Sequence, residues 1–514
     1  MTWIKFGITS RALKYAAVFA AYFVCAEGAS AQDVTFSDAE GGLAVTGRFV
    51  AFDGQMATLA TEAGPVSFRT ADLSCDGAAC PDLENYVPTL RMVGSPKMAD
   101  ILIPSLIDAF ARDQRWSLEE NLSGFRMIDT AGDPTFIVTL SVADADAAFS
   151  AFSNHTADVL LSMRELRPAE VTTAFDSGLG RVTQARQARI VALDALVPVV
   201  APTSDRRFIS MAELTDAMSG DSPEWEALLP SEMDGQLQGF EDRFMRPFGL
   251  KMVDASNDFA DQNSLTSAIE EGAAGVSLLP YGATRNTQPL ALSGPCGLVS
   301  EARFLSMKTE DYPLTFPMFL YLPQRAQHPQ IVEFLDWMRS PSAQLVIRRA
   351  GFVDLAAVPI PLSDQGDRLA NAISNAGPEI PLIELQRMVR LLGPRVRMSS
   401  TFRFEPGSTR LDGQSRSNVM QLAQAIRDGR FGGSELMFVG FSDGRGPATA
   451  NRDLSSARAE AVRRDVERAL NGQIPRNVAI DTDAFGEAMP MACDDTIWGQ
   501  QTNRRVELWV RDAG

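Results

Sequence analysis

Histidine is almost absent from this chain, which has only two histidines, His155 and His328, among its 514 residues. The segment Gly440–Gly444 has the G-x-S-x-G pattern that surrounds the nucleophilic serine of many hydrolases. Such an enzyme needs a histidine after the serine in the chain, but both histidines precede Ser442. The glycines and the proline that follow also favour a loop over a helix beginning at the serine. We therefore expect no catalytic residues and a protein that is not an enzyme.

Basic residues are outnumbered by acidic ones, with 47 Lys and Arg against 65 Asp and Glu and a formal net charge of −18. Nucleic acid is therefore not an expected partner, because neutralising phosphates requires clustered Lys and Arg. Beyond the N-terminal segment, no apolar run approaches the ~20 residues that a helix needs to span a bilayer. We expect no transmembrane segment in the mature chain, no metal site and no cofactor.

The N-terminus has the three parts of a secretory signal peptide. Lys5, Arg11 and Lys14 form a basic start, Ala16–Val24 is an apolar core, and Ala29–Ala31 is a small-residue cleavage site. We expect residues 1–31 to be removed on export, which changes the formal charge to about −20. The remaining length of about 480 residues predicts about three domains.

Cysteine is scarce as well, and four cysteines remain after that removal. Cys75 and Cys80 are separated by a short turn that contains glycine, so they can form a local disulfide in an oxidising compartment. A metal site is the alternative, but zinc needs further ligands and no histidine is near in sequence. Cys296 and Cys493 are either bridged between domains or both free, and the sequence leaves both states open.

Residues 32–86 have the pattern of a small β-rich module. Asp53-Gly54 and Ala63-Gly64-Pro65 mark hairpin turns between three β-prone runs. Residues 32–86 contain no recognisable catalytic or binding motif. We expect a β-meander that is closed by the Cys75–Cys80 bridge and serves as a spacer or packing module.

The C-terminal part has a strand-loop-helix pattern. Ser434–Val439 is apolar and β-prone, and the helix after the loop is expected to bury one face, formed by Leu454, Ala457, Ala461, Val462, Val466 and Ala469. An earlier helix repeats Val419, Leu422, Ala423 and Ile426 before it stops at Gly429. The closing strand alternates Val506, Leu508 and Val510 with Glu507 and Trp509, as a half-buried strand does. These elements predict a compact α/β sandwich.

This order of elements, with Asp443 and Asn451 in the loop, Arg458 on the helix and NRRVELWV at the end, resembles the OmpA-like peptidoglycan-binding domain. The resemblance implies that Asp443 holds the ammonium of a diaminopimelate-type side chain and that Arg458 holds its carboxylate. Asn451 belongs to the same peptidoglycan-binding set. The family's usual His-Thr before the aspartate is replaced by Phe441-Ser442, which removes one hydrogen-bonding partner.

From Leu90 onward, strands alternate with helices, which favours parallel sheets. The strand Leu90–Gly94 runs into Ser95, an expected helix N-cap, and Pro96, an expected first helical residue. The free amides at such a helix N-terminus can bind an anion, and a plain capped helix is the alternative. The segments LLSMREL, ALDALVPVV, SLLPYG and FPMFLYLP follow in one order.

Together these segments resemble a type 2 periplasmic binding protein, specifically the phosphate-binding (PstS-like) component of phosphate ABC transporters, from Leu90 to about Ala357. ALDALVPVV looks like the hinge strand that crosses between the two lobes of such a protein. The resemblance places a small oxyanion at Ser95, Ser162, Arg164, Asp234 and Gly235. Pro96, which has no backbone N–H, and Met163, which stands where some phosphate binders have a carboxylate, depart from that pattern and favour weak binding.

The fold class expected is α/β multidomain: a small N-terminal β-meander, a two-lobed binding-protein fold and a C-terminal α/β sandwich. The expected boundaries are 1–31 for the signal peptide, 32–86 for the β module, 87–358 for the binding-protein-like domain, 359–395 for a helical linker and 396–514 for the OmpA-like domain. Within the linker, an amphipathic helix is expected to bury Leu382, Ile383, Leu385, Val389 and Leu392.

These expectations describe a periplasmic protein that is held non-covalently to peptidoglycan, near the outer membrane of a Gram-negative bacterium. Its central domain binds phosphate or another small oxyanion. In the alternative interpretation, that domain has lost its ligand and acts as a structural adaptor that contacts other envelope proteins.

Overall fold

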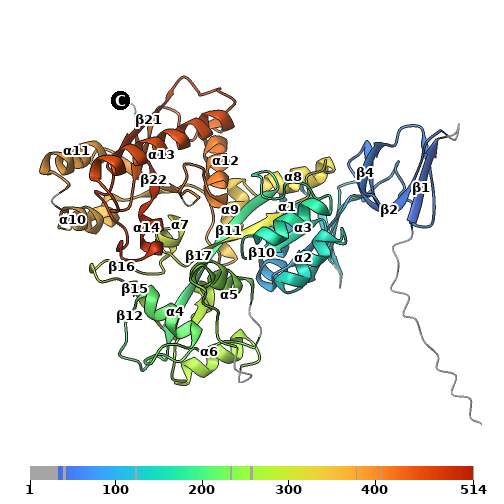
Figure 1. Ribbon diagram of the computed structural model, residues 1–514. Helices are drawn as coiled ribbons and strands as arrows, with labels where there is room; N and C mark the ends of the chain where they lie inside the picture. The colour runs from blue at the N-terminus through green and yellow to red at the C-terminus, as the bar shows by residue number, and fades with distance from the viewer. Residues whose placement is uncertain are drawn as a thin grey trace, which may run out of the picture.

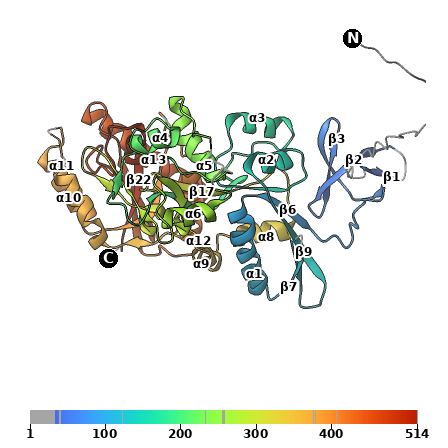
Figure 2. The ribbon, with the colours of Figure 1, turned by 90° about the horizontal axis from the view of Figure 1, so that it is seen from below.

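The computed structural model arranges the chain as three units in a row (Figure 1). It describes residues 33–38, 42–121, 124–231, 234–254, 259–374, 376–377, 379–405 and 407–512, so the expected signal peptide lies outside the described residues. In both views the N-terminal β module and the helices α10 and α11 lie at opposite ends of the molecule (Figures 1 and 2). Across the described ranges, no helix is both long enough and apolar enough to cross a membrane.

The N-terminal unit is one antiparallel sheet of five strands in the order β4-β3-β2-β1-β5. The strands are β1 (Asp33–Asp38), β2 (Ala44–Phe52), β3 (Met56–Thr61), β4 (Gly64–Arg69) and β5 (Leu73–Asp76). Gly54 has a φ of 99° in the β2–β3 turn, a conformation that favours glycine and that explains the hairpin at this point. Cys75 and Cys80 form the expected disulfide, with Cα atoms 5.9 Å apart.

The first lobe of the central unit contains the strands from β17 to β7 of a mixed sheet whose order runs β13-β11-β17-β10-β6-β9-β8-β7 and which continues into the second lobe at β13. β6 lies parallel to both β9 and β10, as the strand-helix alternation predicts. The elements of this lobe are β6 (Thr89–Gly94), η1 (Lys97–Leu102), α1 (Ile103–Gln114), β7 (Ser117–Asn121), β8 (Gly124–Ile128), β9 (Pro134–Val142), α2 (Ala145–Ser153), β10 (Val159–Ser162), α3 (Pro168–Asp176), β17 (Thr315–Tyr321), α8 (Pro329–Trp337) and α9 (Pro341–Arg349).

The strand β11 (Ala188–Val200) connects the two lobes. Its first half pairs with β17, and its last residues pair with β13 and β14 of the second lobe, as expected of a hinge strand. The second lobe contains β12 (Phe208–Ile209), α4 (Met211–Ser219), α5 (Gly235–Phe240), η2 (Glu241–Met245), η3 (Arg246–Phe248), α6 (Gln262–Glu270), β13 (Ser277–Pro280), η4 (Tyr281–Ala283), β14 (Gln288–Pro289), β15 (Ala291–Ser293), β16 (Val299–Ser300) and α7 (Phe304–Lys308).

The C-terminal unit has a five-stranded sheet in the order β18-β19-β22-β20-β21. Its elements are β18 (Pro359–Ile360), η5 (Leu362–Gln365), α10 (Gly366–Ser374), α11 (Leu382–Leu392), β19 (Val396–Phe402), α12 (Gly413–Arg427), β20 (Ser434–Phe441), α13 (Ala448–Ala469), β21 (Val478–Ala484), α14 (Ile497–Asn503) and β22 (Arg505–Asp512). One face of the sheet packs against α12 and α13, and the other face packs against α10 and α11. On α12, the expected buried residues Val419, Leu422, Ala423 and Ile426 are confirmed.

Three expectations for this unit were only partly right about which residues are buried. β22 is not half-buried, because Glu507 and Trp509 are covered by the helices of the second face. On α11, Leu385 and Leu392 are buried as expected, together with Met388, whereas Leu382, Ile383 and Val389 are exposed. On α13, Ala461, Val462 and Val466 are buried as expected, together with Ser455, Arg458 and Ala459, whereas Leu454 and Ala457 are exposed.

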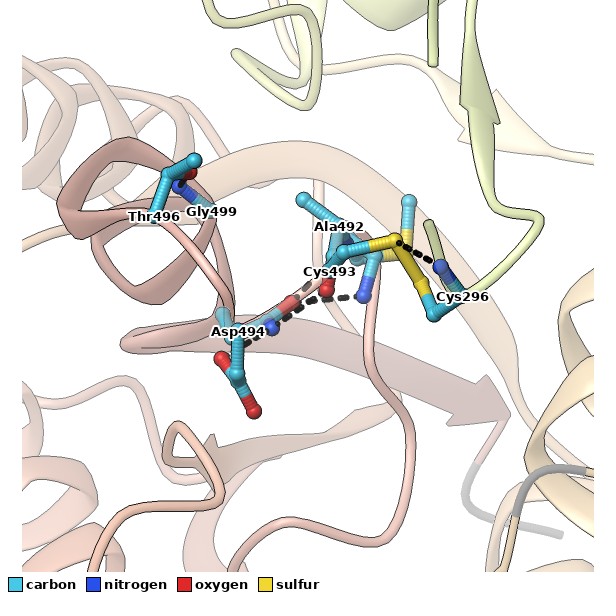
Figure 3. The surroundings of a disulfide bond; sticks show 8 residues. Cys296, Ala492, Cys493, Asp494, Thr496 and Gly499 are labelled. Atoms are coloured by element: carbon cyan, nitrogen blue, oxygen red, sulfur yellow. Dashed lines mark hydrogen bonds between the residues drawn. A yellow bond between two sulfur atoms is a disulfide. The ribbon is translucent and has the colours of Figure 1, made fainter. Parts of the chain in front are cut away.

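The C-terminal unit is fastened to the second lobe. Cys296 and Cys493 form a disulfide between the two, with Cα atoms 5.6 Å apart (Figure 3), which answers the question that the sequence left open. Trp498 of α14 packs against Phe244 and Phe248. The buried carboxylate of Asp311 forms ion pairs across the contact with two guanidiniums, those of Arg397 at 2.9 Å and Arg403 at 3.4 Å.

Candidate functional site

Asp443 lies in the loop that follows β20, at the end of the sheet. Its side chain is 8% exposed and forms an ion pair with Arg504, which immediately precedes β22. The other carboxylate oxygen accepts a hydrogen bond from the backbone N–H of Arg445 at 3.2 Å. The antiparallel pairing of β20 with β22 explains this meeting, because Phe441 lies opposite Arg505 in the register. Asp443 is therefore engaged within its own unit.

Arg458 projects from the buried face of α13 and is only 3% exposed. Its guanidinium carbon lies 5.1 Å from the centre of the Phe404 ring. Among the described residues, neither Nε nor Nη1 of this guanidinium has a hydrogen-bond partner. Burial lowers the pKa of Arg458 and the charge of Arg504 lowers it further, while Asp443 opposes them. A buried cation with unused donors is costly unless a ligand supplies the acceptor.

Asn451 is at the start of α13, and its side-chain amide donates a 2.5 Å hydrogen bond to Glu487. Burial raises the pKa of Glu487, and Asp494 and Asp443 are among the carboxylates that raise it as well. Burial also raises the pKa of Asp494, whose carboxylate accepts a 2.7 Å hydrogen bond from the N–H of Gly444. No sequence motif indicated Glu487 or Asp494, although the segment that contains them follows β21 and so returns to this end of the sheet.

A cavity of about 430 Å³ lies between the C-terminal unit and the central unit. Arg458, Arg504 and Phe404 line it from the C-terminal side. Glu165, Arg243 and Glu310 line it from the central side. The cavity thus brings Arg458 of one unit to the same space as charged residues of the other, a juxtaposition that no sequence motif indicated.

Glu310 has an unusual environment. It adopts a φ of 57°, which is uncommon for a residue with a side chain. Its Oε1 accepts a hydrogen bond from the amide of Asn418 at 3.3 Å. Desolvation raises the pKa of Glu310 to about 8, and Asp412 contributes in the same direction against Arg403 and Arg243. Backbone strain together with a displaced pKa is frequent at functional sites.

We expect the stability contribution of Glu310 to depend on pH. Because its pKa is about 8 in the folded protein and near 4.5 when unperturbed, the folded state holds a proton that the unfolded state releases between these values. Stability should fall as pH rises through this window, by about 1–3 kcal/mol after allowing for water in the cavity. Urea unfolding of the wild type and of Glu310→Gln at pH 5.5 and 8.5 should show the variant gaining relative stability at the higher pH. An equal difference at both pH values would contradict this expectation.

Arg164, expected at an oxyanion site, is 3% exposed and is bound by carboxylates of its own lobe. Its Nη1 and Nη2 donate hydrogen bonds of 2.8 and 2.6 Å to Glu170, and its Nε donates to Gln238 at 3.1 Å. The hydroxyl of Ser162 donates to the carbonyl of Arg164 at 2.7 Å. The guanidinium of Arg164 is already neutralised by Glu170.

The cleft between the lobes is bridged by a lysine. Lys97, at the start of η1, donates a hydrogen bond to Gln236 and lies 3.5 Å from a carboxylate oxygen of Asp194 and 3.7 Å from one of Asp234. Asp234 caps α5 by accepting from the N–H groups of Gln236 and Leu237. A Cβ atom built on Gly235 would lie 3.4 Å from the Cβ of Met163, so the lobes are in close contact there.

The expected cap at Ser95 is only partly realised. The Ser95 carbonyl accepts hydrogen bonds from the N–H groups of Met98 and Ala99, so the helix does begin there. No side-chain hydrogen bond caps this end of η1. Lys97, the first residue of η1, bridges the lobes through its contacts with Gln236, Asp194 and Asp234, a role that no sequence motif indicated.

Residues 403–504 match the model of the OmpA family. Among solved structures, a peptidoglycan-associated lipoprotein from Burkholderia pseudomallei is 24% identical, with 22% of this chain and 90% of that chain covered and a TM-score of 0.20. An ABC-type phosphate transport receptor from Vibrio cholerae is 14% identical over 52% of this chain and 99% of its own, with a TM-score of 0.39. A phosphate ABC transporter substrate-binding protein with bound phosphate from Clostridium perfringens is 10% identical over 52% of this chain and 100% of its own, also with a TM-score of 0.39.

A comparison with curated proteins found no match. The family match covers the segment from the end of β19 to the residue before β22, and thus includes Asp443, Asn451, Arg458 and Arg504. Residues 403–504 of this chain therefore form an OmpA-like domain.

Proposed function

We propose that the protein attaches non-covalently to peptidoglycan through its OmpA-like domain and resides in the periplasm, near the outer membrane of a Gram-negative bacterium. The observation that carries this proposal is the buried guanidinium of Arg458, whose Nε and Nη1 have no partner among the described residues and which lines a cavity. A carboxylate of a diaminopimelate-type side chain supplies two acceptors in one plane, which matches a guanidinium. Asp443 is the carboxylate that the family resemblance assigns to the ammonium.

The test is co-sedimentation of the intact mature protein with purified Gram-negative sacculi. We expect saturable pelleting that excess free meso-diaminopimelate reverses, because the free amino acid carries the same carboxylate and ammonium groups. Albumin added to the same tubes controls for trapping in the pellet. A mature protein that stays in the supernatant at all sacculus concentrations would overturn the proposal.

For the central unit, the contacts of Arg164 and Lys97 support the adaptor interpretation over oxyanion binding. Arg164 is held by Glu170, so an oxyanion would have to displace a buried charge-assisted pair. Lys97 fills the space between the lobes and is itself balanced by Asp194 and Asp234. The disulfide between Cys296 and Cys493 ties the second lobe to the OmpA-like domain, which supports a fixed lobe arrangement over hinge closure around a ligand.

We expect phosphate titration of the intact mature protein to give no saturable heat up to about 1 mM, since both cationic groups near the cleft are neutralised internally. Isothermal titration calorimetry measures this, and the same experiment with sulfate extends the test to another oxyanion. Micromolar binding of either anion would restore the oxyanion function as the better interpretation.

A further inference from the structure

The cavity between the OmpA-like domain and the central unit is charged differently at its two sides. On the OmpA-like side, Nε and Nη1 of Arg458 have no partner in the described part of the chain, while Arg504 is engaged by Asp443. Asp443 itself is not among the residues that line the cavity. On the central side, Glu165 and Glu310 line it, while Asp412, the N-cap residue of α12, lines it from the OmpA-like side. A ligand carboxylate that enters this cavity can therefore pair with the guanidinium of Arg458.

The carboxyl groups across the cavity repel one another. Desolvation raises the pKa of Glu165, and the charges of Asp412 and Glu405 raise it further. Glu310 is subject to the same influence from Asp412. Arg243, Arg403 and Arg416 are the cations that oppose this effect, and Nη1 of Arg243 donates to the carbonyl of Thr315 at 3.2 Å. The carboxyl groups of Glu165 and Glu310 offer oxygen acceptors to a ligand ammonium that enters the cavity.

We propose that this cavity binds an amino-carboxylate ligand whose carboxylate lies on Arg458 and whose ammonium lies at Glu165 and Glu310 of the central unit, rather than at Asp443. The inference rests on the proposed wall binding for the role of Arg458. It makes the central unit the second wall of the peptidoglycan site, so the disulfide and the Asp311 ion pairs hold the two halves of one site together. The ligand chemistry is shared by wall stem peptides and by free diamino acids.

Titration calorimetry of the intact mature protein tests the inference with three probes: free meso-diaminopimelate, pimelate, which lacks the amines, and a diaminopimelate-containing stem tripeptide. We expect pimelate to bind about tenfold more weakly than meso-diaminopimelate, because it leaves the carboxyl groups without a cation. Glu165→Gln and Glu310→Gln should remove this preference at pH 8.5 and leave pimelate binding unchanged. Tighter binding of the tripeptide than of free meso-diaminopimelate identifies the wall as the source, and the reverse order identifies a free amino acid.

The preference for meso-diaminopimelate over pimelate should also change with pH. Glu310 is faced by Asp412, Arg403, Arg243 and the amide of Asn418, and it loses its proton near the upper end of the range. The wild type should therefore favour meso-diaminopimelate more strongly at pH 8.5 than at pH 6.5, whereas Glu310→Gln should show a smaller change. Thermal unfolding of each variant shows that it is folded, and Glu467→Gln, on the opposite part of α13, is the matched control.

Two results separate this inference from the proposed function. If Asp443→Asn removes the preference for meso-diaminopimelate while both glutamate variants retain it, the inference is overturned and wall binding through the OmpA-like domain stands. If Arg458→Leu binds both small ligands and sacculi as the wild type does, the proposed function itself fails. Equal binding of pimelate and meso-diaminopimelate by the wild type would also overturn the inference.

Discussion

Replacing Arg458 with leucine is expected to weaken sacculus binding about 100-fold without lowering the stability of the protein, since two charge-assisted hydrogen bonds are lost from the complex only. In the unliganded protein this guanidinium is buried with Nε and Nη1 unpartnered among the described residues. Leucine removes a desolvated charge and retains contact with Phe404. Arg458→Leu should therefore bind sacculi more weakly while its free energy of unfolding stays the same or rises, as at other sites where an unpaired group is held for a ligand.

The measurement is a sedimentation isotherm with sacculi, combined with urea unfolding of the same preparations. Arg464→Ala is the matched control, because Arg464 is on the same helix and is exposed. It should bind as the wild type does. Loss of stability in Arg458→Leu comparable to its loss of binding would show that the residue has a structural role, and unchanged pelleting would remove it from the site.

Replacing Glu507 with glutamine should destabilise the C-terminal unit by about 3–5 kcal/mol, because it leaves buried guanidiniums without their countercharge. Glu507 is fully buried and accepts hydrogen bonds from Arg505 at 2.7 Å and from Arg368 at 2.5 Å. Burial alone would raise its pKa, but Arg368, Arg397 and Arg505 outweigh burial and hold the pKa far below its usual range. Arg397 also pairs with Asp311, so the change weakens the contact between the units.

Native-state hydrogen exchange of the amides in β22 measures this effect locally, which suits a protein with several units. The control is Glu467→Gln, which disrupts a partly exposed pair with Arg463 within α13 and should cost no more than about 0.5 kcal/mol. Protection of β22 that falls equally in both variants would contradict the special role of the buried cluster.

The sequence predicted the OmpA-like unit well because its signals are local. The strand, the loop and the helix that carry Asp443, Asn451 and Arg458 are neighbours in the chain, and their periodicity follows from their own backbone. Burial on the second face of the sheet was not predictable in this way. A glutamate that alternates with valine and leucine is predicted to be solvent-exposed. Glu507 is buried because α10 and α11 pack on this face of the sheet.

The central unit shows the opposite case. The hinge strand β11 was predictable from its long, mainly apolar run, and its residues from Ile190 to Val200 are all buried. The role assigned to Arg164 came from a motif, but its partner Glu170 is the third residue of α3 and lies close in sequence, so a search for nearby carboxylates would have found it. The cavity at Arg458 had no sequence signal, because its two sides come from segments that meet only when the units dock.

The most direct test of the account is a structure of the intact mature protein bound to a diaminopimelate-containing stem tripeptide. The account predicts that a ligand carboxylate accepts hydrogen bonds from Nε and Nη1 of Arg458 inside the cavity, with the ligand ammonium toward Glu165 and Glu310. A tripeptide bound in the cleft beside Lys97, or at a surface that does not include Arg458, would contradict the account.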